Sequence, residues 1–445
     1  MKKRSVNLLG KLLFMTVMFG LFTPLTAQAQ DDARIEKLES SVKALQAELD
    51  ALKAERARAA RKAPPVVDQE QLEQLVSQTF EEKKGEYGVA PDWIKKITPF
   101  GDFRYRYESL HNSGDELGNE RRRNHIRARL GFKAQINDEW DTTFRIATGS
   151  SDTATSTNQT LDDSFEEKDL WLDLGYAAWH PEECPDLNVF MGKMKNPFYT
   201  VGKNQLIWDG DVNPEGGAAS YEFVLDDATM ATFVGGAFWL NERDTDADAG
   251  YFGIQGRLKH ELDGGKYLVC GASFYDIGNI DSKTSAGSGV TLMGNTPTTL
   301  GGAIYRYDYD LAEVFAEYGW KCNDMPVAVF SNYVENTAAP NGSNTAYSIG
   351  CQFNKAKEPG SWQFKASCRE VESDAAFGGL SDSDFIDGGT GGKGWVLGGK
   401  YQVAKNVQAG LTCFLNDRDR RNTGGSGGNG SQNFERIQAD LVFKF

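Results

Sequence analysis

From about residue 98 to its end, the chain alternates between apolar and polar side chains in short runs. The last run is the clearest, with Ile437, Ala439, Leu441, Phe443 and Phe445 interleaved with Arg436, Gln438, Asp440, Val442 and Lys444. A period of two residues is typical of a β-strand that has one apolar and one polar face. The alternation therefore predicts an all-β region over residues 97–445.

The connections between these runs alternate between two sizes. Short turns such as 137–139 and 405–406 contrast with long loops rich in Gly, Ser, Thr, Asn and Asp at 148–168, 196–216, 276–300, 372–393 and 417–433. Short turns at one rim and long loops at the other are typical of a transmembrane barrel of the bacterial outer membrane. A soluble sandwich or propeller would not show this alternation. We expect the Gly-rich tracts near 388–394 and 424–430 to be mobile.

The number of strands depends on how residues 304–320 are interpreted. One long strand there gives sixteen antiparallel strands in all, whereas a split at Asp310 gives seventeen. An odd number would leave the C-terminus on the wrong side of the membrane, so we predict sixteen. The apolar parity shifts within this run, after Leu311, and we expect a β-bulge at that point.

Residues 1–29 have the features of a secretory signal peptide. Three basic residues, Lys2, Lys3 and Arg4, precede an apolar run over 8–22, and Ala27-Gln28-Ala29 fits a cleavage site. The alternative is a retained membrane anchor, but the run is shorter than the ~20 residues that span a bilayer. We therefore expect an exported chain that begins near Gln30.

Residues 30–62 carry a heptad pattern. Its a and d positions are Ile35, Leu38, Val42, Leu45, Leu49 and Leu52. A strict 3.5-residue period favours an α-helical coiled coil over a solitary amphipathic helix, which is the alternative. Pro64 and Pro65 end the helix, and residues 63–96 are expected to form a linker with a short helix over 68–84. Ile and Val at a with Leu at d favour dimers over trimers.

Composition limits the possible partners. The 445 residues carry a net charge of −15, which argues against nucleic acid as a partner because phosphate contacts need a basic surface. The mean hydropathy of −0.49 is low. A membrane barrel still fits it, because only every second strand residue faces lipid.

The candidate chemistry is sparse. Cys270, Cys351, Cys368 and Cys413 fall on the apolar parity of predicted strands, and the other two cysteines lie in turns, so we expect free thiols. An acidic run over 244–248 departs from the EF-hand template. The sequence offers no Ser–His–acid grouping and no metal-ligand spacing. We expect no enzymatic activity, no metal and no cofactor.

One polar parity carries a row of basic residues in this otherwise acidic chain. The expected interior positions, with Arg123 at the loop end of the same row, are Arg104, Arg106, Arg123, Arg127, Arg129, Lys133, Arg145 and Arg436. Because interior side chains set the selectivity of a barrel, these residues are candidates for a pore lining. The loop 196–216 adds three acidic candidates, Asp209, Asp211 and Glu215.

Motifs spread over residues 98–445 together resemble the "putative porin" family of Gram-negative bacteria. They are GDFRYR (101–106), RNHIRAR (123–129), ATG (147–149), NQT (158–160), GKMKNPF (192–198), WDGD (208–211), NPEG (213–216), EVFAE (313–317) and FLNDR (414–418). The resemblance implies a 16-stranded outer-membrane barrel for passive diffusion of small solutes. The coiled coil is similar to periplasmic segments of some trimeric porins, phosphate-selective ones included. The resemblance of the fold implies a homotrimer, which the heptads permit.

In sixteen-stranded porins the loop that corresponds to 196–216 folds into the lumen and narrows it. We hypothesise that its acidic residues face the basic wall across a constriction and set up a transverse field. The alternative is that the arginines pair with interior carboxylates such as Glu108 and Asp440 and only brace the wall.

A second function remains open, in which the barrel is an anchor in outer-membrane lipid. The coiled coil would then tether the outer membrane to peptidoglycan from the periplasm. The basic residues Arg56, Arg58, Arg61 and Lys62 near the helix end motivate this alternative.

Overall fold

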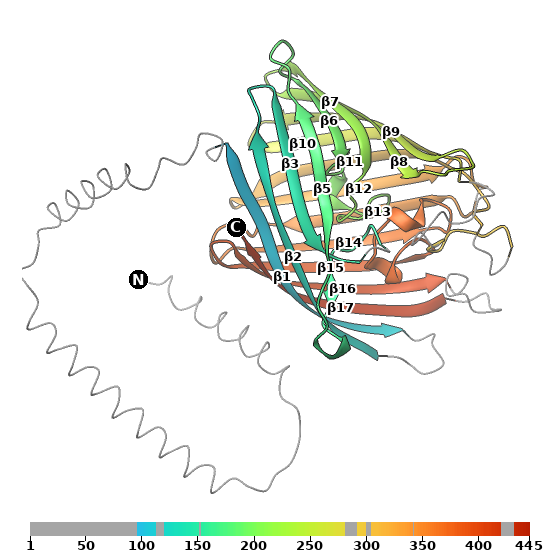
Figure 1. The fold of residues 1–445 in the computed structure, drawn as a ribbon. Helices are drawn as coiled ribbons and strands as arrows, with labels where there is room; N and C mark the ends of the chain where they lie inside the picture. Colours follow the sequence, from blue (N-terminus) through green and yellow to red (C-terminus); the bar gives the residue numbers. More distant parts are fainter. Residues whose placement is uncertain are drawn as a thin grey trace, which may run out of the picture. The chain divides into compact units, whose positions relative to one another are not determined.

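The computed structural model describes residues 96–112, 120–150, 153–280, 292–299, 304–340, 342–419 and 431–445. In these residues the segments of period two form strands, and each long strand pairs antiparallel with the next. The first strand, β1 (Ile97–Asn112), also pairs with the last, β17 (Ser431–Lys444), so the sheet closes into a barrel (Figure 1). The predicted all-β barrel is confirmed.

Sixteen strands make the wall, as predicted. Between β1 and β17 these are β2 (Glu120–Gln135), β3 (Trp140–Thr148), β5 (Leu170–Trp179), β6 (Leu187–Lys193), β7 (Glu215–Asp226), β8 (Thr229–Asn241), β9 (Ala249–Leu262), β10 (Lys266–Gly278), β11 (Tyr309–Cys322), β12 (Met325–Asn336), β13 (Thr345–Phe353), β14 (Trp362–Val371), β15 (Gly392–Ala404) and β16 (Val407–Asp419). The remaining strand, β4 (Gln159–Thr160), is a two-residue segment within a loop that pairs with His125 and Ile126 of β2.

The apolar parity of the wall faces outward. Leu130 is 54% exposed and Ile349 is 59% exposed, although both lie in the middle of strands. A continuous apolar outer band matches a hydrocarbon environment better than water. The six cysteines are free, and four of them stand on this outer parity, as the alternation predicts. In the part of the chain that the structure describes, no helix is long and apolar enough to cross a membrane.

The bulge expected within 304–320 does not form. β11 begins only at Tyr309 and pairs in unbroken register with β10 and β12. Tyr309 and Leu311 are fully buried inside the barrel, whereas Val314 is 55% exposed on the outside. The prediction was wrong because the interior is apolar here, and the ring of Tyr309 lies 5.6 Å from that of Phe377.

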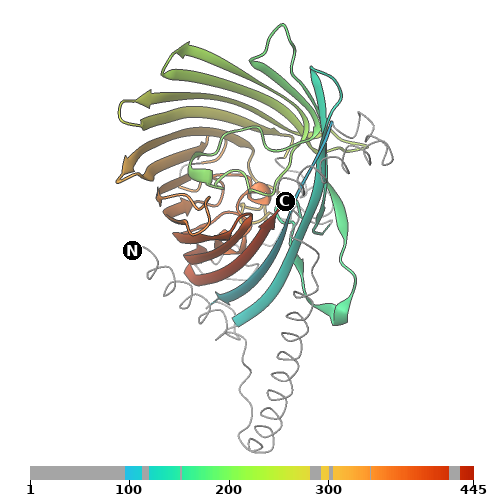
Figure 2. The same cartoon turned by 90° about the vertical axis from the view of Figure 1, so that its left-hand side faces the viewer.

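Loops from one rim enter the barrel and pack there (Figure 2). Residues 194–214, 292–308 and 372–391 contribute to one apolar cluster with inward side chains of the wall. A barrel of this size has too wide a lumen to be filled by wall side chains alone. The tract near 388–394 is therefore largely buried rather than mobile, and that prediction was wrong.

The N-terminal predictions lie outside the described residues. They are the signal peptide 1–29, the coiled coil 30–62 and, apart from Lys96, the linker 63–96. The second Gly-rich tract, 424–430, also falls there.

Candidate functional site

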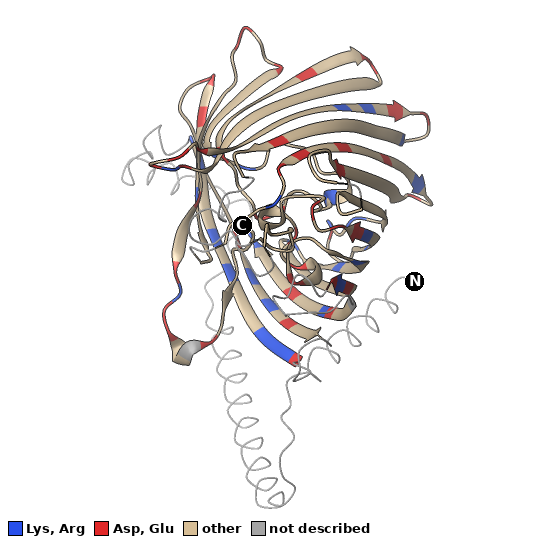
Figure 3. Cartoon of the chain, turned by 90° about the vertical axis from the view of Figure 1, so that its right-hand side faces the viewer, with Lys and Arg blue, Asp and Glu red and all other residues tan. Residues whose placement is uncertain are grey.

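The basic residues predicted for the interior all lie on one side of the wall, where β17, β1, β2 and β3 run side by side. Strand parity turns Arg104 and Arg106 of β1 inward, and the β1–β2 register sets Arg104 opposite Arg127. On the other side of β1, Arg106 faces Asp440 of β17. Basic and acidic positions lie near one another on the strands and on the inner loops (Figure 3).

A first group of charges ties the loop 194–214 to the wall. Arg127 donates from Nε to Asp102 Oδ1 at 3.1 Å, and Arg129 also pairs with Asp102. Asp211 of the loop lies beside the same two guanidinium groups, 3.5 Å from Arg129 Nη1 and 3.9 Å from Arg127 Nη1. Burial raises the pKa of the Asp211 carboxyl, but the two arginines outweigh burial and hold that pKa below its ordinary value.

Asp209 behaves differently although it stands two residues away. Its carboxylate accepts hydrogen bonds from the backbone N–H of Asp211 and of Ser383, both at 2.8 Å. Burial and the nearby carboxylates of Asp382 and Asp211 raise the pKa of Asp209 well above its ordinary value. The two loop aspartates therefore do not form one acidic surface, because Asp211 faces the wall and Asp209 faces the loop 372–391.

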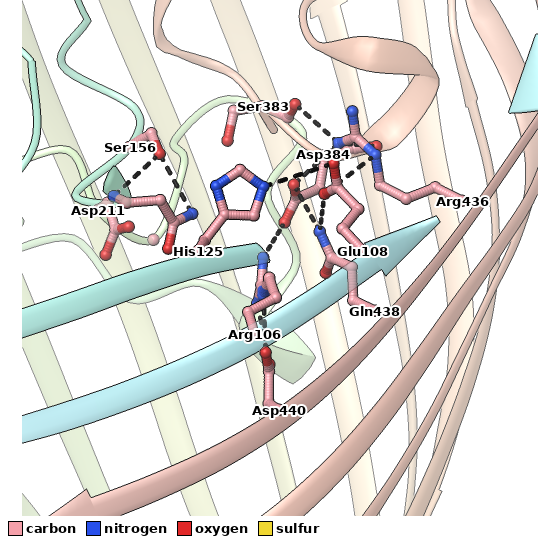
Figure 4. Close-up of polar contacts among 12 residues, drawn as sticks. Arg106, Glu108, His125, Ser156, Asp211, Ser383, Asp384, Arg436, Gln438 and Asp440 are labelled. Carbon is pink, nitrogen blue, oxygen red and sulfur yellow. Dashed lines mark hydrogen bonds and ion pairs between the residues drawn. The ribbon is translucent and has the colours of Figure 1, made fainter. Parts of the chain in front are cut away.

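A second group joins the loop 372–391 to β1 and β17 (Figure 4). Asp384 accepts from Arg436 Nη1 at 2.8 Å and from Arg106 Nη1 at 3.3 Å. Arg106 also donates from Nε to Asp440 at 2.7 Å. Burial raises the pKa of Asp384, but Arg106 and Arg436 bring it below its ordinary value. Glu108, the other central carboxylate, pairs with Arg436 at 3.6 Å.

The other predicted positions are dispersed. Arg123 pairs with Glu108, Arg145 with Asp173 at 2.5 Å, and Lys133 with Asp141 at 2.8 Å. Lys133 is near the short-turn rim and its side chain is 55% exposed. Glu215 is not brought to the arginines, since it pairs with Lys193 at 2.6 Å on the outer face of β6 and β7.

Two sets of interior residues were not predicted from the sequence. The loop 372–391 supplies Asp382, Asp384 and Asp387, of which Asp382 pairs with Arg369 of β14. The sequence did hold a sign that this Gly-rich loop is buried. The loop carries four large apolar residues that are rare in a solvent-exposed loop, Phe377, Leu380, Phe385 and Ile386. Lys195 was also missed; burial and the neighbouring Arg145 and Arg129 lower its pKa to about 8.

The site consists mainly of ion pairs and charged hydrogen bonds. Arg106, Arg127, Arg129 and Arg436 each pair with at least one carboxylate. Arg104 instead donates to Asn158 Oδ1 at 2.5 Å. Within the described ranges, no three His, Cys, Asp or Glu side chains gather in a way that could hold a metal ion. On this side of the barrel the interior is thus a polar network between the wall and two inner loops, beside the apolar cluster that the loops also form.

The family of the chain follows from its sequence. The family described as "Putative porin" matches residues 115–303 and 301–418, which together make up more than half of the chain. The chain belongs to this family. The resemblance drawn from the motifs is thereby confirmed, and the family is one of channels, not of enzymes.

Solved porins share the fold at low sequence identity. OprB of Pseudomonas putida, in a high-pH structure, is 12% identical with a TM-score of 0.52, over 82% of this chain and 97% of that chain. OmpF of Salmonella typhi, in complex with daunomycin, is 12% identical with a TM-score of 0.47, over 78% of this chain and 97% of that chain. No curated protein matches the chain by sequence. The likeness to OprB shows a shared barrel fold.

Proposed function

We propose that the protein is a general outer-membrane porin through which small hydrophilic solutes and ions diffuse passively. The observation that carries this proposal is the closure of β1 on β17 around an interior rich in charged residues, with apolar side chains outside. A closed barrel can span lipid because every strand is paired, and its charged interior side chains can line a path for ions.

The loop 194–214 is the proposed constriction. Tyr199 N–H donates to Gln255 of β9 at 2.8 Å, Gly202 C=O accepts from Lys365 of β14 at 2.6 Å, and Asp211 lies against β2. Since β2 and β9 stand well apart around the barrel, contacts to both support a loop that crosses the lumen. The passage would then run past Arg104, Arg127 and Arg129, with Asp211 as the acidic partner. Glu215 has no part in this proposal.

The test is current through planar lipid bilayers. The purified mature protein should give stepwise conductance, and a folded barrel that carries no current would contradict the proposal. A variant that lacks residues 31–62 should conduct equally well if the coiled coil only supports assembly. Loss of envelope integrity with intact conductance would favour the peptidoglycan tether as an added role.

We also propose a homotrimer in the outer membrane, with lipid around it and the coiled coil in the periplasm. Support comes from the family resemblance. The heptads over 30–62 permit a trimer, although their a and d residues favour a dimer. Crosslinking of the full chain should yield trimers, in which case current steps in groups of three are expected. A ladder that stops at monomer would contradict the trimer.

A further inference from the structure

A second basic cluster lies inside the barrel, apart from the arginines of β1 and β2. Lys365 of β14 and Lys400 of β15 share the inward parity of their strands, and Lys365 stands opposite Gly398. Lys203 reaches the same place from the loop 194–214, since Lys365 Nζ donates to the C=O of the adjacent Gly202 at 2.6 Å. The three ammonium groups are close enough to repel one another. The cluster lies toward the short-turn rim.

These lysines differ from the interior arginines because they have no acidic partner. Within the described part of the chain, none of the three forms an ion pair with a carboxylate. The carboxylates whose attraction they feel, Asp382 and Asp440, already pair with Arg369 and Arg106. The contacts that Lys365 makes in the described residues are with the Gly202 carbonyl and with the ring of Phe330, 5.3 Å from its Nζ.

The cluster is open to water and held by a constrained backbone. Lys203 and Lys400 are exposed although they lie within the barrel, and a Cβ on Gly398 would meet no atom within 4 Å. Lys203 adopts a left-handed φ of 52°, which residues other than glycine rarely adopt. Just before it, the Phe330 ring leaves no space for a side chain at Gly202. The loop thus brings a third positive charge toward two others.

A carboxylate, Glu317, lies beside the cluster, but it accepts from Gly202 N–H at 3.3 Å and from the Tyr267 hydroxyl at 2.7 Å and forms no ion pair with a lysine. Three ammonium groups in one place, with no ion pair of their own, repel one another, and a bound anion would relieve that repulsion. Each ammonium offers up to three N–H donors, and an oxyanion has several oxygen acceptors that can be shared among them. We propose that Lys203, Lys365 and Lys400 form a binding site for a small oxyanion, below the constriction on the path to the short-turn rim. The inference rests on the proposed channel only for its functional consequence, because binding itself needs no current.

The test measures block of chloride current by inorganic phosphate in planar bilayers. Millimolar phosphate should reduce the current of the wild type. The variant that combines Lys203→Gln, Lys365→Gln and Lys400→Gln should need at least about tenfold more phosphate for the same reduction. The control is Lys393→Gln, an exposed residue on the outer parity of β15. Equal block in the triple variant and the control would overturn the site. Lys203→Gln alone changes only a loop residue and serves if the triple variant does not fold.

Failure of the channel and failure of the site can be told apart. If the wild type carries no current, calorimetric titration of phosphate onto the detergent-solubilised full chain decides the matter. Binding by the wild type and Lys393→Gln, lost in the lysine variants, supports the site even in a closed barrel. Binding that is absent from the wild type, or unchanged in the variants, overturns it.

Discussion

Asp211 of the loop 194–214 lies 3.5 Å from Arg129 of β2, so an inner loop is joined to the wall by an ion pair largely screened from water. Asp102 shares the same arginine from β1. The basic wall thus meets the loop through direct contact as well as through wall carboxylates. Of the three acidic residues predicted on the loop, Asp211 is the one that meets these arginines.

The two loop aspartates should respond differently to the same substitution. The lowered pKa of Asp211 contributes stability above the ordinary carboxyl pKa, and this contribution is lost as pH falls through the folded value. The raised pKa of Asp209 costs stability at neutral pH. At pH 7, Asp211→Asn should lower the free energy of unfolding in detergent by about 1–3 kcal/mol. Asp209→Asn should change it by less than about 1 kcal/mol. Equal losses would contradict the assigned charge states.

Removal of the basic wall should change which ions pass. The combined variant Arg104→Gln, Arg127→Gln and Arg129→Gln should shift the reversal potential in a salt gradient toward cation preference, since charges in a narrow pore act strongly. The matched control removes three exposed lysines near the short-turn rim, Lys266, Lys321 and Lys405. If the arginine variant and this control have the same reversal potential, the basic wall has no role in ion selectivity.

Lys195 should make selectivity depend on pH. Its pKa of about 8 means that the ammonium is protonated below that pH and neutral above it. The charged groups that act on it are Arg145, Arg129, Asp173 and Asp211. The reversal potential should therefore move toward cation preference as pH rises from 7 to 9. Lys195→Met should abolish the transition. The control is Lys193→Met, two residues away on the outer face, which should retain it.

The inner position of the loop 372–391 should depend on Asp384. Asp384→Asn leaves Arg106 and Arg436 with fewer acceptors and should free the loop to move. Chymotrypsin should then cut after Phe377 or Phe385, which are buried in the wild type. Asp244→Asn removes the same charge from an exposed loop and should leave the cleavage rate unchanged. Similar resistance in both variants would show that apolar packing alone holds the loop.

The local sequence determined the wall of the barrel. Alternation along a strand sets which side chains face lipid, so the strands and the outward cysteines Cys270 and Cys413 could be predicted residue by residue. The inward parity of Arg104, Arg127 and Arg436 followed from the same rule. These are local properties, because a single strand with lipid on one face and the lumen on the other already requires alternating apolar and polar residues.

Only the tertiary structure decided what fills the barrel. Tyr309 and Leu311 look like lipid-facing residues until the loop 372–391 packs against them from inside, and this reversed the predicted parity. Asp384 meets Arg106 across 278 residues of chain, and the alternation of either segment contains no sign of the other. Which loops enter the lumen, and which charges they bring to the wall, depends on contacts distant in sequence, and a period of two residues cannot encode them.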